Sequence, residues 1–149
     1  MKIALGADHG GYELKNEIRT HLIDQGIEIL DLGTNSKESV DYPKYGFRVG
    51  KAILQGEADL GIVVCGTGLG ISMAANKVPG IRAALCTETY SARMSREHNN
   101  ANVLALGGRV TGVGLALDIV DMFIKTPFAG GRHARRVDLL TSIEMGEEL

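Results

Sequence analysis

Short apolar runs of strand length alternate along the chain with segments that repeat apolar residues at helical spacing. The runs cover residues 3–5, 27–30, 60–64, 81–85 and 103–106. Between them, sets such as Leu14, Ile18 and Leu22 recur as on one face of a helix. Because right-handed crossovers join successive parallel strands, this alternation predicts an α/β fold. We expect a Rossmann-like three-layer sandwich, with five mainly parallel strands and helices on both faces.

Polar and glycine residues follow three of the predicted strands. Asp8 and His9 follow the first, Cys65 ends the third, and Gly107, Gly108 and Arg109 follow the fifth. The ligand site of an open parallel sheet lies beyond the carboxyl ends of its strands, so these residues are expected on one rim. We interpret residues 1–149 as a single domain, with an extra C-terminal helix that packs outside the main layers.

Composition excludes several classes of protein. A net charge of −2 gives no basic field for nucleic acid or anionic lipid. No run of about 18 apolar residues is present, which argues against a membrane span. Two cysteines are too few for a disulfide framework, and no signal-peptide pattern precedes the first strand. We therefore expect a cytoplasmic protein.

A glycine-rich turn, residues 66–70, follows Cys65 directly. Its G-x-G-x-G pattern matches neither the dinucleotide fingerprint nor the Walker loop. Backbone amides of such a turn can face a phosphate or an oxyanion and shift the thiol toward thiolate. Cys65 is then a candidate base or nucleophile, whereas Cys86 is interpreted as a core residue. The alternative is that the glycines only permit tight packing.

Other candidate residues have structural alternatives of their own. Asp8 either binds a sugar hydroxyl or caps the next helix, and His9 either meets a phosphate or shuttles a proton. His98, with Asn99 beside it, is either a site residue or a dipole partner at a helix C-terminus. Arg132 and Arg136 lie four residues apart on one face at the start of a helix, where a phosphate would relieve their conflict with the macrodipole. The alternative is a solvated basic face paired with Glu144, Glu147 or Glu148. No zinc-ligand spacing occurs, so we expect no metal.

A series of blocks resembles the type B ribose-5-phosphate isomerases, in the same order along essentially the whole chain. They are residues 8–11 (Asp-His-Gly-Gly), 39–43 (Ser-Val-Asp-Tyr-Pro), 65–72 (Cys-Gly-Thr-Gly-Leu-Gly-Ile-Ser), 74–77 (Ala-Ala-Asn-Lys), 80–83 (Gly-Ile-Arg-Ala), 95–99 (Ser-Arg-Glu-His-Asn) and 130–133 (Gly-Gly-Arg-His). Subunits of galactose-6-phosphate isomerase and an allose-6-phosphate isomerase share this pattern.

The resemblance implies interconversion of ribose 5-phosphate and ribulose 5-phosphate through an enediolate, without metal or cofactor. Cys65 would be the general base at C2, Thr67 would assist, and His98 would open the furanose ring. The loop that stabilises the enediolate would consist of Gly66, Gly68, Gly70 and Ser72.

The resemblance also implies how the rest of the sugar phosphate is held. Asp8 would bind the ring oxygen or hydroxyl groups, and Asn99 would position the sugar. The phosphate would bind His9, Arg109, Arg132 and Arg136. The family builds its site at a dimer interface, which implies a homodimer or a dimer of dimers. The partner chain would then supply some of His98, Asn99 and Arg109. The family usually has Asp where this chain has Asn100, so local hydrogen bonding is expected to differ.

Two alternatives stay open. The first is an isomerase of a six-carbon sugar phosphate, either allose 6-phosphate or galactose 6-phosphate. Cys65 favours the ribose interpretation, because one galactose-6-phosphate isomerase subunit type lacks the thiol. The second is a non-catalytic phosphosugar-binding regulator, which would need the anion-binding groups but not the thiol.

Overall fold

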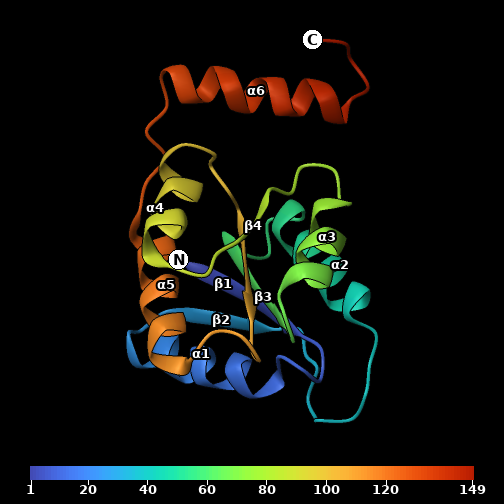
Figure 1. Ribbon diagram of the computed structural model, residues 1–149, viewed down its shortest axis with the longest axis vertical. Coiled ribbons are helices and arrows are strands. Elements are labelled where there is room, and N and C mark those ends of the chain that lie inside the picture. The colour runs from blue at the N-terminus through green and yellow to red at the C-terminus, as the bar shows by residue number, and fades with distance from the viewer.

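The computed structural model describes residues 1–149 and contains one five-stranded sheet (Figure 1). The strands are β1 (Lys2–Ala7), β2 (Glu28–Asp31), β3 (Leu60–Cys65), β4 (Ala83–Leu85) and β5 (Val103–Gly107). They lie in the order β2-β1-β3-β5-β4, and every neighbouring pair is parallel. The predicted α/β fold is confirmed, and the sheet is wholly rather than mainly parallel.

The fourth strand is shorter than its apolar run predicts. It begins at Ala83, whereas the run begins at Ile81. The Arg82 amide donates to the side chain of Asn102 over 2.8 Å, so a side chain takes the place of a ladder partner there.

Six helices surround the sheet: α1 (Tyr12–Asp24), α2 (Tyr42–Leu54), α3 (Leu69–Asn76), α4 (Thr89–Glu97), α5 (Val113–Lys125) and α6 (Arg132–Glu144). Alternate residues of each strand face opposite layers. Ile3 and Leu5 pack with apolar residues of α1, α4 and α5, while Ala4 and Val63 pack with residues of α2 and α3. Figure 1 shows α4 and α5 to the left of the sheet and α2 and α3 to the right, which gives the expected three layers.

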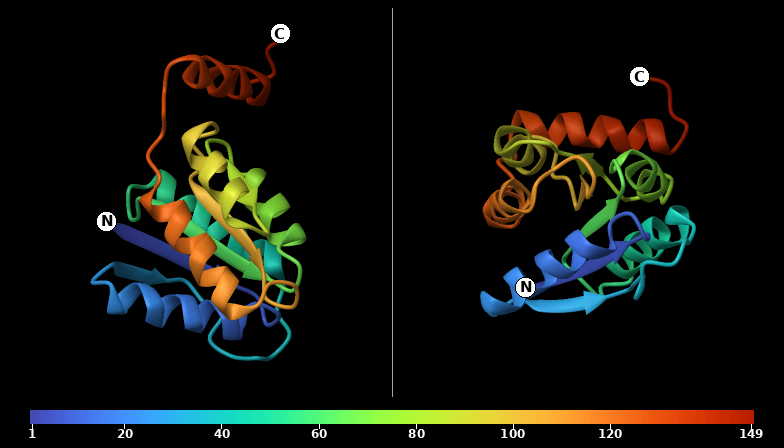
Figure 2. Two further views of the ribbon diagram at one scale, coloured as in Figure 1. Left: turned by 60° about the vertical axis from the view of Figure 1, so that its left-hand side comes forward. Right: turned by 60° about the horizontal axis from the view of Figure 1, so that its bottom comes forward.

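The last helix stands outside these layers, as the sequence predicts. In Figures 1 and 2, α6 crosses one end of the molecule, on the side where β4 and β5 begin. Val137 is its only buried residue. Leu139, Leu140 and Ile143 are 40%, 46% and 54% exposed, so the helix leaves most of its apolar surface uncovered within one chain.

Candidate active site

The three predicted strand-end segments meet at one rim, beyond the carboxyl ends of β1, β3 and β5. The Gly108 amide donates to the Cys65 carbonyl over 2.8 Å, and the Arg109 amide donates to the Gly66 carbonyl over 2.9 Å. A Cβ on Gly10 would lie 3.0 Å from the amide nitrogen of Gly66. The backbone segments around these residues are therefore in contact, and the predicted common rim is confirmed.

The thiol of Cys65 faces the glycine turn. Its Sγ accepts a hydrogen bond from the Gly68 amide over 3.1 Å, although the residue as a whole is 5% exposed. Gly68 has φ +81°, a left-handed conformation that glycine adopts without strain and that turns its amide back toward the sulfur. The hydrogen bond therefore holds the sulfur against the turn. The turn thus has the geometry that the sequence predicts.

The other residues of the turn mostly organise the first turn of α3. Thr67 Oγ1 accepts from the Leu69 amide over 3.2 Å, and Ser72 Oγ donates to the Leu69 carbonyl over 2.7 Å. Thr67 is exposed, while Ser72 is buried. A Cβ on Gly70 would lie 2.7 Å from the ring of Tyr42, so this glycine permits close packing of α2 and α3.

Asp8 shapes its loop and does not cap α1. Its Oδ1 accepts from the amides of Gly10 and Gly11 over 2.9 and 3.2 Å, while Gly11 itself occupies the N-cap position. The alternative in which Asp8 is a helix cap is therefore wrong. Its other carboxylate oxygen accepts no hydrogen bond within the chain.

His9 is held from the opposite side by the loop that follows β2. The Val40 amide donates to Nδ1 of His9 over 3.2 Å. An acceptor at Nδ1 places the proton of the neutral ring on Nε2, which leaves an N–H donor for a ligand. A pocket of about 300 Å³ lies beside His9, and its lining includes Glu13, Lys37, Gly108 and Arg109.

The remaining predicted residues gather at the other end of the molecule. His98 is the C-cap of α4, and its ring stacks on that of His133, with centroids 4.1 Å apart and 9° between the planes. Burial lowers the pKa of His133, and the nearby His98, Arg132 and Arg136 lower it further. Arg132 and Arg136 are exposed and form no ion pair, and Glu144 instead accepts from the Gly80 amide over 3.0 Å. The two arginines are thus solvated, but the predicted alternative in which they pair with Glu144, Glu147 or Glu148 is absent.

The sheet separates these two groups within one chain. Cys65 and Arg109 lie at the carboxyl ends of the strands, whereas His98 and Asn99 precede Ala101 and Val103 at the amino end of β5. Five strand residues, Val103–Gly107, span roughly 16 Å. A single chain therefore does not bring His98 to Cys65. Arg109, which the resemblance grouped with His98 and Asn99, lies instead with Cys65.

Asn100, the departure from the family pattern, has a local role. It has φ +46°, and its Oδ1 accepts from Nη1 of Arg96 over 3.2 Å. Asn is among the residues that tolerate this conformation best. Its side chain thus joins the turn that follows α4.

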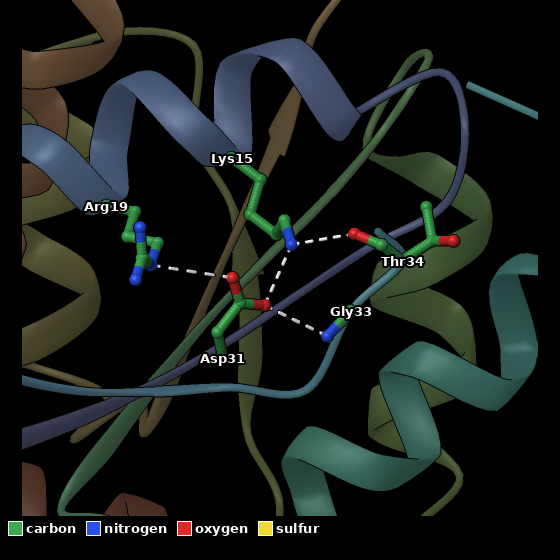
Figure 3. Close-up of polar contacts among 5 residues, drawn as sticks. All are labelled: Lys15, Arg19, Asp31, Gly33 and Thr34. Atoms are coloured by element: carbon green, nitrogen blue, oxygen red, sulfur yellow. Dashed lines mark hydrogen bonds and ion pairs between the residues drawn. The ribbon is translucent and has the colours of Figure 1, made fainter. Parts of the chain in front are cut away.

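Two lysines near the rim do not stand out in the sequence. Lys15 is 1% exposed and pairs with Asp31, as Figure 3 shows, and Lys37 pairs with Glu13. Lys15 lies in α1 beside Leu14 and near Ile18, which are buried, so its position on the inner face was the available signal. Lys37 has no pattern around it that points to a site.

The chain also lacks some features of other site types. No group of three or more His, Cys, Asp or Glu side chains is placed to hold a metal ion. No helix is both long enough and apolar enough to cross a membrane.

Comparisons with known proteins identify the family of the chain. The model of the family described as Ribose/Galactose Isomerase matches residues 3–140. The chain is 54% identical to ribose-5-phosphate isomerase B of Escherichia coli strain K12 over 143 residues, and this alignment covers 96% of each of the two chains. Its fold matches a ribose-5-phosphate isomerase B structure from Clostridium thermocellum with a TM-score of 0.97 and 62% identity, over 98% of this chain and 99% of the other. It also matches the Mycoplasma genitalium enzyme with bound ribulose-5-phosphate, with a TM-score of 0.91 and 42% identity over 97% and 96% of the two chains. The chain therefore belongs to the ribose/galactose isomerase family.

Proposed function

We propose that the protein interconverts ribose 5-phosphate and ribulose 5-phosphate, with Cys65 as the general base. The observation that carries this proposal is the hydrogen bond from the Gly68 amide to Cys65 Sγ, which aims the sulfur into the glycine turn at the rim. The relative from E. coli is named for this activity. The M. genitalium structure contains ribulose-5-phosphate, the ketose product of the reaction. Both support the same chemistry for this site.

In the proposed mechanism, the thiolate of Cys65 removes the proton from C2 of the open-chain aldose. The electron pair of the broken C–H bond moves into the C1–C2 bond, and the carbonyl oxygen gains negative charge as the enediolate forms. Amides of the turn from Gly66 to Gly70 stabilise this oxyanion, with Thr67 at its edge. Cys65 then returns the proton to C1, and the proton of the O2 hydroxyl passes to O1, so that a ketone forms at C2 and a hydroxyl group at C1.

We infer that a second copy of the chain completes the site. Ring opening by His98 needs that residue near the sugar, yet the sheet lies between His98 and Cys65 of one chain. The uncovered apolar surface of α6, including Leu140 and Ile143, is typical of an oligomer interface. In this dimer, one copy supplies Cys65, Asp8, His9 and Arg109, and the other supplies His98, Asn99, Arg132 and Arg136.

Turnover of purified protein on ribose 5-phosphate, with chelator present, tests the activity. Parallel assays on allose 6-phosphate and galactose 6-phosphate separate the five-carbon from the six-carbon interpretation through the ratio of kcat/KM values. Higher kcat/KM on a six-carbon substrate would overturn the ribose assignment. Binding of all three without turnover would instead support a regulator.

A subunit-mixing experiment tests the shared site. Cys65→Ala and His98→Asn proteins are each expected to be nearly inactive. In a mixed dimer, one of the two sites retains both residues, so random exchange of subunits should restore about a quarter of wild-type activity. No recovery after exchange, with mixed dimers demonstrated by mass spectrometry, would contradict a site built from two chains.

A further inference from the structure

We propose that Lys37 is an additional ligand for the phosphate end of the substrate, supplied by the chain that supplies Cys65. Lys37 lines the pocket of about 300 Å³ together with His9 and Arg109. This role presupposes the proposed function, because it names a further group at the same site. Nothing in the resemblance or the sequence pattern assigns it.

The pocket adjoins the backbone of Cys65, because the amide of Gly108, which is part of its lining, donates to the Cys65 carbonyl over 2.8 Å. The guanidinium of Arg109 lies against Gly66, since a Cβ there would be 3.3 Å from Nη1 of Arg109. Gly10 and Gly108 of this lining contact the Cys65–Gly66 backbone, and Glu13 and Lys37 are further charged residues of the same lining. The reacting carbons and the phosphate occupy opposite ends of a five-carbon sugar phosphate. A substrate whose C2 lies at Cys65 therefore directs its phosphate toward these cations.

The loop that carries Lys37 is fixed at its start by a buried ion pair. Figure 3 shows Lys15 reaching from α1 to this loop. Its Nζ lies 2.7 Å from Asp31 Oδ1 and 2.7 Å from the Thr34 carbonyl, while the Gly33 amide donates to the same Asp31 oxygen over 2.9 Å. Lys15 is 1% exposed, so this connection is shielded on the lysine side, and it orients the chain as it leaves β2.

The far end of the loop is fixed by the site itself. The Val40 amide donates to His9 over 3.2 Å, so the segment returns to the rim three residues after Lys37. Lys37 thus lies between two anchored points. These two anchors hold the backbone of the loop beside the pocket that Lys37 lines.

A carboxylate holds the Lys37 ammonium in the absence of an anion. Nζ of Lys37 lies 2.5 Å from Oε1 of Glu13, and the two side chains are 70% and 75% exposed. Their mutual hydrogen bond and attraction lower the pKa of Glu13 and raise the pKa of Lys37, so both are charged at neutral pH. Such exposed pairs are weak. A phosphate of charge near −2 can therefore displace Glu13 as the partner of Lys37.

A double-mutant cycle tests this assignment, with inorganic phosphate as the probe. The proteins are wild type, Lys37→Gln, Glu13→Gln and the double variant, and calorimetry gives the dissociation constant of phosphate for each. Lys37→Gln should raise this constant about fivefold, and Glu13→Gln should lower it because a repelling carboxylate is lost. The Lys37→Gln effect should persist in the Glu13→Gln background. Its disappearance there would show that Lys37 only neutralises Glu13, and would overturn the proposal.

Lys125→Gln provides the matched control. It removes the same charge from the last turn of α5, a helix of 13 residues that runs about 20 Å away from the rim. The dissociation constant of phosphate for Lys125→Gln should equal that of the wild type. In ribose 5-phosphate assays, Lys37→Gln should raise KM by a similar factor and leave kcat within about twofold.

The two readouts separate this assignment from the proposed function. Phosphate affinity that depends on Lys37, in a protein that does not isomerise ribose 5-phosphate, would support Lys37 and overturn the activity. Turnover, together with a dissociation constant of phosphate that is the same for Lys37→Gln and the wild type, would support the activity and overturn the assignment of Lys37 as a phosphate ligand.

Discussion

The Gly68 amide points at the sulfur of Cys65, with 3.1 Å between nitrogen and Sγ. The contact joins the last residue of β3 to the residue just before α3. It exists because Gly68 adopts φ +81° at a place where its backbone passes close to Leu106. The conformation of one glycine thus fixes the direction of the thiol on which the proposed reaction depends.

Replacing Gly68 with alanine should therefore damage both stability and activity. The new Cβ would lie 2.5 Å from Cδ1 of Leu85 and 2.9 Å from the Leu106 carbonyl carbon, in a strained backbone conformation. We expect a loss of about 2–4 kcal/mol in the free energy of unfolding, measured with denaturant, and a large fall in kcat. Gly114→Ala is the control, because no atom lies within 4 Å of a Cβ there. Equal stability of the two variants would contradict this account of the turn.

The second cysteine should be unreactive in the folded protein. Burial raises the pKa of Cys86 to about 11, so its thiol remains protonated at pH 8. Mass spectrometry after iodoacetamide treatment at pH 8 should find Cys86 unmodified in native protein and modified after unfolding. Modification of Cys86 in the native protein at the rate found in the unfolded protein would be inconsistent with its place in the core.

The buried ion pair of Lys15 and Asp31 should respond unequally to loss of either partner. Asp31→Ala leaves the ammonium of Lys15, which is 1% exposed, with only the Thr34 carbonyl. A loss of about 3–5 kcal/mol is expected in denaturant unfolding. Lys15→Met should cost less, because Asp31 is 25% exposed and keeps Arg19 at 3.6 Å. A larger loss of stability in Lys15→Met than in Asp31→Ala would show that the cost of burying an unpaired lysine does not dominate the free energy of this pair.

Stability should fall in mildly acidic solution partly because of His133. Its pKa in the fold is lowered by burial, and further by His98, Arg132 and Arg136. Since the unfolded ring titrates near pH 6.5, the unfolded chain binds the proton more tightly. The contribution of His133 is therefore intact above about pH 6.5 and is lost as pH falls below that value. His133→Gln should show a smaller drop in thermal midpoint between pH 7 and pH 5.5 than wild type, and an identical drop would contradict this assignment.

The sequence predicted the sheet and the rim well, because both depend on local patterns. An apolar run as short as 60–64 that ends in a glycine-rich turn is typical of a buried strand, and polar or glycine residues at its end mark the ligand edge. The start of β4 was predicted less accurately, because the Arg82 amide donates to the side chain of Asn102, twenty residues away along the chain. No local pattern reveals such a contact.

The residue patterns did not separate His98 from Cys65, and only the resemblance allowed for it, by assigning some of His98, Asn99 and Arg109 to a partner chain. The connectivity nevertheless contains the signal. A helix that joins two parallel strands must run back to their amino ends. His98 at the C-terminus of α4 therefore lies far from a thiol at the carboxyl end of β3. Lys15 and Lys37 depend on partners in other segments, Asp31 and Glu13, and only the three-dimensional arrangement identifies these pairs.

Exchange at C2 tests the central role of Cys65 most directly. Ribose 5-phosphate labelled with deuterium at C2 is incubated with wild type and with Cys65→Ala, and loss of the label to solvent is followed by NMR. The wild type should exchange the label, whereas Cys65→Ala should slow exchange at least a hundredfold while binding inorganic phosphate as tightly as before. Exchange at the wild-type rate by Cys65→Ala would show that another group removes the proton.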